Sequence, residues 1–223
     1  MCGRYNLRTP ASELVEFFEL HAPPVWTPRY NIAPTQSVLA IRAHGDARMP
    51  ALFRWGLIPN WAKDPAIGSR MINARSETVS DKPSFRSAFR RRRCLVLADG
   101  FYEWQATGGA RKQPWHIERQ DGRPFAFAGL WESWDSGEGS AIESCTIITT
   151  TPNSRLAEIH DRMPVILDAD SYDEWINPEG QDVDRLLELL VPCPDDFLVT
   201  HPVSTYVNSP KNEGPECVEP VGK

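Results

Sequence analysis

Short, strand-like apolar runs recur along the chain without long helices between them. They cover residues 37–42, 51–55, 94–98, 101–104, 115–118, 125–130 and 146–150, and a last run covers 199–203. A doubly wound parallel sheet needs a helix between successive strands, so the pattern argues against that architecture. The sequence predicts an α+β fold built on antiparallel sheet.

Only a few helices are predicted. Residues 11–20 place Leu14, Phe17 and Phe18 on one helical face, and we expect Thr9 to cap this helix with Pro10 at its first position. Two further helices are expected at 169–176 and 183–190. No change of composition marks a linker, so we expect one domain over 1–223, with about 208–223 as an ordered turn or a tail.

Composition narrows the class of protein. Apolar residues make up 41% and charged residues 24% of the 223 residues, as in ordinary globular proteins. No run approaches the roughly 18 apolar residues of a membrane helix, and no secretory signal is visible. The five cysteines form no C-x-x-C pair and no zinc pattern, which favours reduced thiols in the cytoplasm and predicts no metal and no cofactor. The net charge of −6 argues against a broadly basic duplex-binding surface, although a local basic groove is compatible with it.

Cys2 is the first candidate for chemistry. Loss of Met1 would leave it as an N-terminal 1,2-aminothiol, whose amine (pKa about 7.7–8.0) and thiol (about 8.5) both have nucleophilic forms near neutral pH. The amine can form a Schiff base with an aldehyde, and the thiol can then close a thiazolidine ring. The commoner explanation of a small residue at position 2 is a frayed terminus.

Glu103 and His160 are candidates for acid–base work. Strand alternation puts Glu103 on the face of Phe101, where desolvation would raise the pKa of its carboxyl and make it a usable acid or base. His160 stands between Asp161 and Arg162 on one side and Glu158 on the other, so it could shuttle protons. Their ordinary alternatives are a solvated strand charge and a surface or core histidine.

Three polar or aromatic stretches could contact a ligand. In the cluster 73–78, Asn73 could bond a hydroxyl and Arg75 a phosphate, or the cluster could simply end a strand and cap a helix. Arg86 and Arg90–Arg93 place five arginines in eight residues, which could track a phosphate backbone or form a solvated helix face, with Arg93 as a buried structural residue. The aromatic loop 55–61 could stack on unpaired bases, although Trp55 suits a core turn better.

Taken in order, the motifs resemble the SOS response-associated peptidase family, also called abasic site processing proteins. The matching stretches are Met-Cys-Gly-Arg-Tyr at 1–5, Arg-Tyr-Asn-Ile-Ala-Pro at 29–34, Arg-Trp-Gly-Leu-Ile-Pro at 54–59, Ile-Asn-Ala-Arg-Ser-Glu-Thr at 72–78, Arg-Cys-Leu-Val-Leu-Ala-Asp-Gly-Phe-Tyr-Glu-Trp at 93–104, Ile-His-Asp-Arg-Met-Pro at 159–164 and His-Pro-Val-Ser at 201–204. The resemblance covers nearly the whole chain and implies antiparallel sheets in a barrel-like core with peripheral helices.

The resemblance also implies a reaction and a set of roles. Cys2, freed of Met1 (often by self-cleavage in this family), would attack the C1′ aldehyde of an abasic site in single-stranded DNA and form a covalent thiazolidine crosslink, with lyase-type Schiff-base chemistry on the way. Glu103 would orient the amine and move protons, His160 would assist opening of the sugar ring and closure or reversal of the thiazolidine, and Asn73 would bond the opened sugar. The DNA contacts implied are Arg4, Arg75 and Arg162 on phosphates or at the active site, and Pro34 and Trp61 as a wedge at a single-strand/duplex junction. The protein would be a monomer in the cytoplasm, without membrane partners.

One residue departs from the pattern, and two other functions stay open. Family members often have a second tryptophan after the one at position 61, where this chain has Ala62, which affects the wedge more than the chemistry. Class II glutamine amidotransferases also begin Met-Cys-Gly, so an N-terminal-nucleophile amidohydrolase is one alternative. A non-catalytic reader of modified DNA bases is the other.

Overall fold

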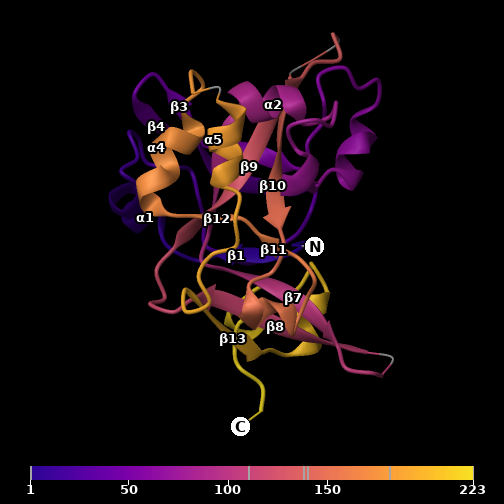
Figure 1. Cartoon of the computed structure of the whole chain (residues 1–223). Coiled ribbons are helices and arrows are strands. Elements are labelled where there is room, and N and C mark those ends of the chain that lie inside the picture. The colour runs from indigo at the N-terminus through magenta and orange to yellow at the C-terminus, as the bar shows by residue number, and fades with distance from the viewer. Residues whose placement is uncertain (1, 110, 138, 140, 181, 223) are drawn as a thin grey trace.

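The computed structural model describes residues 2–109, 111–137, 139, 141–180 and 182–222. Its described strands form two sheets, one above the other in Figure 1. The first runs in the order β13 (Leu198–Pro202), β8 (Lys112–Arg119), β7 (Gly100–Ala106), β1 (Tyr5–Leu7) and β2 (Arg29–Ile32), with antiparallel neighbours throughout.

The second sheet closes on itself. It runs through β10 (Ile142–Thr150), β4 (Ala47–Trp55), β3 (Ser37–His44), β6 (Arg93–Ala98) and β9 (Phe125–Trp134), and β9 pairs again with β10. Three short strands extend it: β11 (Met163–Pro164), β12 (Ile166–Leu167) and β5 (Asn73–Arg75). Most pairings are antiparallel, while β10 runs parallel to β4 and β5. The predicted α+β class with a barrel-like core is confirmed.

Short helices lie outside both sheets. The α-helices are α1 (Ala11–Phe18), α2 (Arg86–Arg91), α3 (Ser154–Ala157), α4 (Tyr172–Ile176) and α5 (Val183–Glu188). Of these, α1, α2, α4 and α5 lie beside the closed sheet in Figure 1. The 3-10 helices are η1 (Pro65–Arg70), η2 (Ser76–Thr78), η3 (Ala169–Ser171), η4 (Thr205–Asn208) and η5 (Pro215–Cys217). Within the described part of the chain, no helix is both long enough and apolar enough to cross a membrane.

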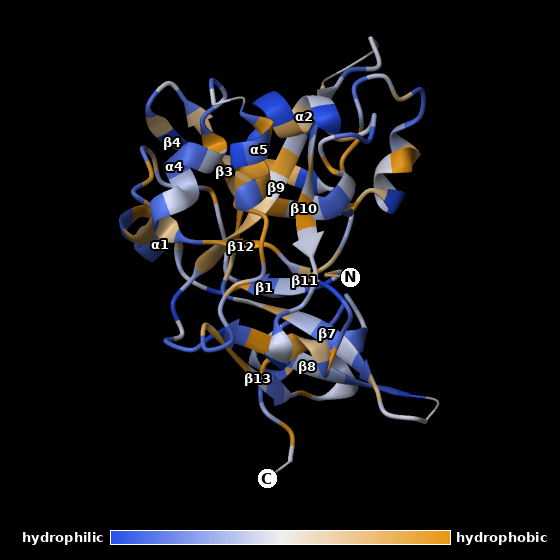
Figure 2. Cartoon of the chain, in the orientation of Figure 1, coloured by the Kyte–Doolittle hydropathy of each residue, from blue (hydrophilic) through white to orange (hydrophobic). Residues whose placement is uncertain are grey.

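The apolar core lies inside the closed sheet and continues to β1. Figure 2 shows apolar residues concentrated on β9, β10 and β12, and hydrophilic ones on the surrounding helices. Tyr5 of β1 packs edge-on against Trp55 and Phe127, with ring centroids 5.4 and 5.8 Å apart. These aromatic contacts fix the start of the chain where the two sheets meet (Figure 1).

The prediction that Thr9 caps the first helix is wrong. Pro10 is the N-cap residue of α1, and Thr9 donates its hydroxyl to Asp99 Oδ1 at 2.6 Å instead of to the helix. Asp99 also accepts the backbone N–H of Thr9 at 2.7 Å, so Thr9 is bonded to a carboxylate distant in sequence and α1 has no side-chain cap. This contact ties α1 to the turn between β6 and β7.

The last described residues, up to 222, are held in ordered turns. Val203 bridges to Pro220, and η5 buries Cys217. Each of the five cysteines is free and buried, in agreement with the expectation of reduced thiols.

Candidate active site

Cys2 lies just before β1, and its side chain is completely buried. Asn73, at the beginning of β5, donates its Nδ2 to the Cys2 carbonyl at 2.8 Å. The Oδ1 of Asn73 is buried and accepts no hydrogen bond from the described residues, so it can still accept one from a ligand. The strand pairing of β5 with β10 therefore places an amide beside the first candidate nucleophile.

Glu103 lies in the middle of β7 on the same face as Phe101, as strand alternation predicts. Only 3% of the residue is exposed. Burial raises the pKa of its carboxyl to about 7, so the group can both take up and release a proton near neutral pH. Burial, followed by the nearby charge of Glu103, raises the pKa of the Cys2 thiol far above its ordinary value. The two residues therefore interact, and the thiol stays protonated until a base acts on it.

His160 follows α3 and faces Glu103. Its Nε2 lies 3.7 Å from Glu103 Oε2, and its Nδ1 lies 2.9 Å from Asp161 Oδ1. The backbone N–H of Arg162 also donates to Nδ1 at 3.1 Å. Burial lowers the pKa of the imidazole, which favours the neutral ring at physiological pH. A neutral imidazole beside a carboxyl that titrates near 7 is suited to passing a proton.

Arg162 is held beside the same site. It forms a two-pronged ion pair with Glu77, with Nη2 3.0 Å from Oε2, and it donates Nη2 to the Thr149 carbonyl at 2.6 Å. Arg162 lowers the pKa of the Glu77 carboxyl. A phosphate that used Arg162 would have to replace this carboxylate, which has the same two-oxygen geometry.

The other predicted DNA contacts lie in different surroundings. Arg75 is exposed at the end of β5, and Pro34 is half-buried after β2. Trp61 is 55% exposed and borders a groove of about 370 Å³ that Arg86 of α2 also lines. Ala62, next to Trp61, is buried against Ile58 and Trp134.

Arg4 makes internal contacts. Its Nη1 donates to Asn31 Oδ1 and to the Val207 carbonyl, each at 2.8 Å, and its guanidinium lies 5.8 Å from the centre of the Trp104 ring. Burial lowers the pKa of this guanidinium. The structure thus brings together Cys2, Asn73, Glu103 and His160, whereas Arg4 ties β1 to η4.

The arginine run divides into two parts. Arg93 is buried, and its partners are carbonyl groups rather than a carboxylate: those of Trp175 at 2.5 Å, and of Phe89 and Gly180 at 2.8 Å. Arg92 pairs with Glu132 at 2.7 Å. Arg86, Arg90 and Arg91 are exposed on α2, and Arg86 lines the groove beside Trp61.

Two residues of the site escaped the sequence reasoning. Glu77 belongs to the motif at 72–78, but no signal in the sequence assigns it a role; its role comes from the ion pair with Arg162. Lys112 of β8 carries a positive charge that partly opposes the rise that burial causes in the pKa of Glu103, and it adds a little to the lowering that burial causes in the pKa of His160. Only the β7–β8 pairing places Lys112 there, and no local signal in the sequence marks it.

The fold and the site together define a protein with a buried amino-terminal cysteine, an amide and a carboxyl–imidazole pair at the junction of two sheets. A family model described as "SOS response associated peptidase (SRAP)" matches residues 1–210. The chain therefore belongs to the SRAP family.

Curated relatives match over their whole length or most of it. The chain is 46% identical to the abasic site processing protein YoqW of Bacillus subtilis (strain 168), over 98% of this chain and 99% of that protein. It is 35% identical to the abasic site processing protein HMCES of Gallus gallus, over 88% of this chain and 67% of that protein. A crystal structure of a Bacteroides thetaiotaomicron protein superposes with a TM-score of 0.89 at 26% identity, covering 99% of this chain and 100% of the other.

Proposed function

We propose that this protein captures abasic sites in single-stranded DNA by forming a thiazolidine between Cys2 and the C1′ aldehyde. The observation that carries the proposal is the convergence of Cys2, Asn73, Glu103 and His160, from four separate segments, at one site in which Cys2 and Glu103 are buried. The names of the relatives support abasic DNA as the substrate class.

The order of steps follows from the protonation states. An exposed α-amine ordinarily has a pKa of about 7.7–8.0, so after loss of Met1 part of the amine of Cys2 is expected to be unprotonated near neutral pH, whereas burial and the charge of Glu103 keep the thiol protonated. The amine therefore attacks C1′ first, and loss of one water gives the Schiff base. The thiol then adds to the C=N carbon, its proton passes to a base, and a five-membered ring closes. The sum is aldehyde plus aminothiol giving thiazolidine plus water.

Glu103, His160 and Asn73 take separate roles in this sequence. An abasic sugar is mainly a closed hemiacetal, so a proton must be added to the ring oxygen and removed from the C1′ hydroxyl before the aldehyde appears. His160 assists this opening. Glu103 accepts a proton from the attacking amine, returns it to the hydroxyl that leaves as water, and then accepts the proton of the thiol. Asn73 holds the Cys2 carbonyl and offers its Oδ1 to a hydroxyl of the opened sugar.

The DNA would follow the surface next to this site. Arg75 and Arg162 would contact phosphates, Arg4 would support the site from within, and Pro34 and Trp61 would meet the bases at a junction. The net charge of −6 leaves room for only a few phosphate contacts, so we expect a shallow salt dependence. The remaining parts of the proposal are removal of Met1 by the protein itself, lyase-type chemistry through the Schiff base, a monomeric state and a cytoplasmic location.

A denaturing gel tests the proposal. Met1-free protein is incubated with a single-stranded oligonucleotide carrying one abasic site, with the undamaged strand, or with the same site in duplex, and Cys2→Ala protein is the matched control. A heat-stable shifted band that needs both Cys2 and the abasic site is expected. A glutaminase activity without this band would favour the amidohydrolase alternative, and reversible binding that tolerates Cys2→Ala would favour the reader.

A further inference from the structure

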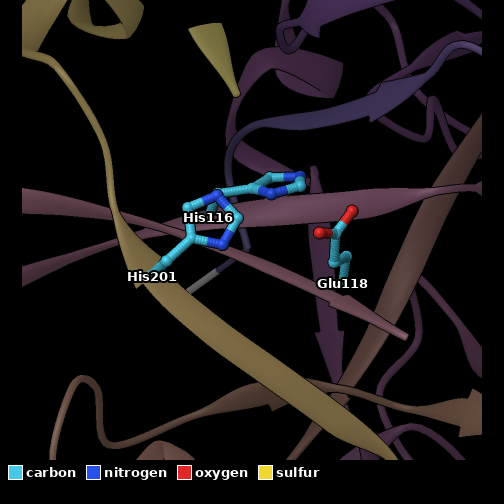
Figure 3. Close-up of side chains that lie close together, drawn as sticks. All are labelled: His116, Glu118 and His201. Carbon is cyan, nitrogen blue, oxygen red and sulfur yellow. The ribbon is translucent and has the colours of Figure 1, made fainter. Parts of the chain in front are cut away.

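His116, Glu118 and His201 form a cluster on the five-stranded sheet. One nitrogen or oxygen donor atom from each lies within 4.8 Å of the other two, and Figure 3 shows the two rings and the carboxylate gathered together. His201 of β13 stands directly opposite His116 of β8 in the strand register, and Glu118 is two residues further along β8. The three side chains therefore share one face of the sheet.

This face is the opposite of the one that carries Glu103. The ring of Tyr102 lies 5.1 Å from the ring of His116, and Glu103 follows Tyr102 in β7, so alternation turns it to the other side. The cluster is thus separate from the candidate active site and plays no part in the reaction proposed above.

His201 is oriented in the manner of a metal ligand. Its Nε2 lies 2.9 Å from the Val218 carbonyl, and a carbonyl only accepts, so Nε2 carries the proton. The Nδ1 of His201 is then left with a free lone pair. Metal-binding histidines are commonly held in this way, with the second ring nitrogen donating to a backbone carbonyl.

His116 is completely buried and has a nitrogen to spare. Its Nε2 lies 2.8 Å from the Asn6 side-chain amide, whereas its Nδ1 and the Asn6 Oδ1 make no hydrogen bond to any described residue. Exchanging the amide oxygen and nitrogen of Asn6 lets Oδ1 accept Nε2–H and leaves the Nδ1 lone pair for a ligand.

The absence of a side chain at Gly100 leaves room for the ring of His116. A Cβ at residue 100 would come within 2.5 Å of His116 Nε2 and 2.8 Å of the Ile117 carbonyl oxygen. Glycine on β7 thus provides the space in which the buried imidazole lies.

We propose that His116, Glu118 and His201 bind one divalent transition-metal ion of the zinc and cobalt class, with water as the fourth ligand. Two imidazoles and a carboxylate suit these ions, which bind at about 2.0–2.2 Å in tetrahedral sites. Such a geometry needs donor atoms roughly 3.3–3.5 Å apart, so the cluster must contract, and Glu118 can do this by exchanging its ion pair with Arg8 for the metal. The ion would clamp β13, and through Val218 the end of the chain, onto β8.

Cobalt titration of the full chain tests the site. The Cys2→Ala background is used, because a free amino-terminal aminothiol can chelate metal by itself. We expect saturable one-to-one binding with cobalt d–d bands and without a thiolate charge-transfer band. His201→Ala and Glu118→Gln should each raise the Kd at least about 10-fold, while His44→Ala, on the exposed end of β3, should leave it unchanged.

Thermal unfolding gives an independent readout. Zn²⁺ should raise the Tm of the Cys2→Ala parent and of His44→Ala, and it should leave the Tm of His201→Ala nearly unchanged. Mg²⁺ should not raise the Tm of the parent. Both His201 and Glu118 are partly exposed, so these variants are expected to fold. The proposal would be overturned if the parent showed no saturable binding. It would also be overturned if binding survived both His201→Ala and Glu118→Gln, or if His44→Ala weakened binding as much as they do.

Discussion

The Oε2 of Glu103 and the Nε2 of His160 lie 3.7 Å apart in a site that excludes nearly all water from the carboxyl. Burial raises the pKa of the carboxyl to about 7 and lowers that of the imidazole, so the ordinary order of the two groups is reversed and Glu103 holds a proton more readily than His160 does. A carboxyl that titrates near 7 beside a neutral imidazole is suited to acid–base work near neutral pH.

Glu103→Gln should slow crosslinking by about 100-fold or more, because positioned general acid–base groups commonly contribute at least that much. Single-turnover rates of crosslink formation measure this, with the exposed Glu16→Gln of α1 as control. The wild-type rate should also rise with pH through about 7 as Glu103 ionises, and the variant should lose that step. A variant with the wild-type rate and pH profile would remove Glu103 from the mechanism.

The same variant should be more stable than the wild type at alkaline pH. The folded pKa of Glu103 is about 7 against an ordinary 4.5, so folding favours the protonated carboxyl. Its contribution is fully present below pH 4.5 and is lost as pH rises through 7, by at most about 3 kcal/mol. Urea unfolding at a series of pH values should show wild type and Glu103→Gln converging in acid, with the variant gaining between about pH 4.5 and 7 and keeping a constant advantage above pH 7. A gap that does not change with pH would contradict the burial argument.

His160→Gln should slow the reaction with the closed form of the abasic sugar. We expect crosslinking to a natural abasic site to slow about 100-fold, because opening of the hemiacetal loses its acid–base partner. An oligonucleotide whose aldehyde cannot cyclise should react nearly as fast with the variant as with the wild type. Equal slowing on both substrates would instead assign His160 to a later step.

Substitutions of Arg93 and Arg86 should affect different properties: the first the stability of the fold, the second the binding of DNA. Arg93→Ala leaves buried carbonyls without donors and should lower the free energy of unfolding by roughly 3 kcal/mol or more. Arg86 lies on the surface beside Trp61, so Arg86→Ala should change the free energy of unfolding by less than about 0.5 kcal/mol. The same variant should reduce the slope of log binding constant against log salt concentration for single-stranded DNA by about 0.7. Denaturant unfolding and fluorescence anisotropy provide the two readouts. An unchanged salt slope for Arg86→Ala would place the DNA away from this groove.

The sequence predicted the longer elements well because their signals are local. The runs at 37–42, 51–55 and 94–98 lie within β3, β4 and β6, and the helix at 183–190 contains α5. The two-residue strands β11 and β12 carry no periodicity to recognise. Closure of the barrel depends on the long-range pairing of β9 with β10, and the sequence alone does not show this pairing.

The chemistry of single residues is local, whereas their contacts are not. Cys2 and Glu103 can be recognised as candidates from their residue types, and the structure places Glu103 beside Cys2 and His160. The pairing of Arg162 with Glu77 depends on segments 85 residues apart. The expected cap at Thr9 failed for the same reason, because Asp99 reaches it from 90 residues away.

The most direct test of the central claim compares Met1-free wild type with Cys2→Ser, each incubated with abasic single-stranded DNA with and without borohydride. Both proteins can form a Schiff base through the α-amine, but only the thiol gives a ring that survives denaturation without reduction. The account predicts a heat-stable crosslink for the wild type in the absence of borohydride, and one for Cys2→Ser only in its presence. A wild-type crosslink that needs borohydride, or a Cys2→Ser crosslink that forms without it, would contradict thiazolidine formation at Cys2.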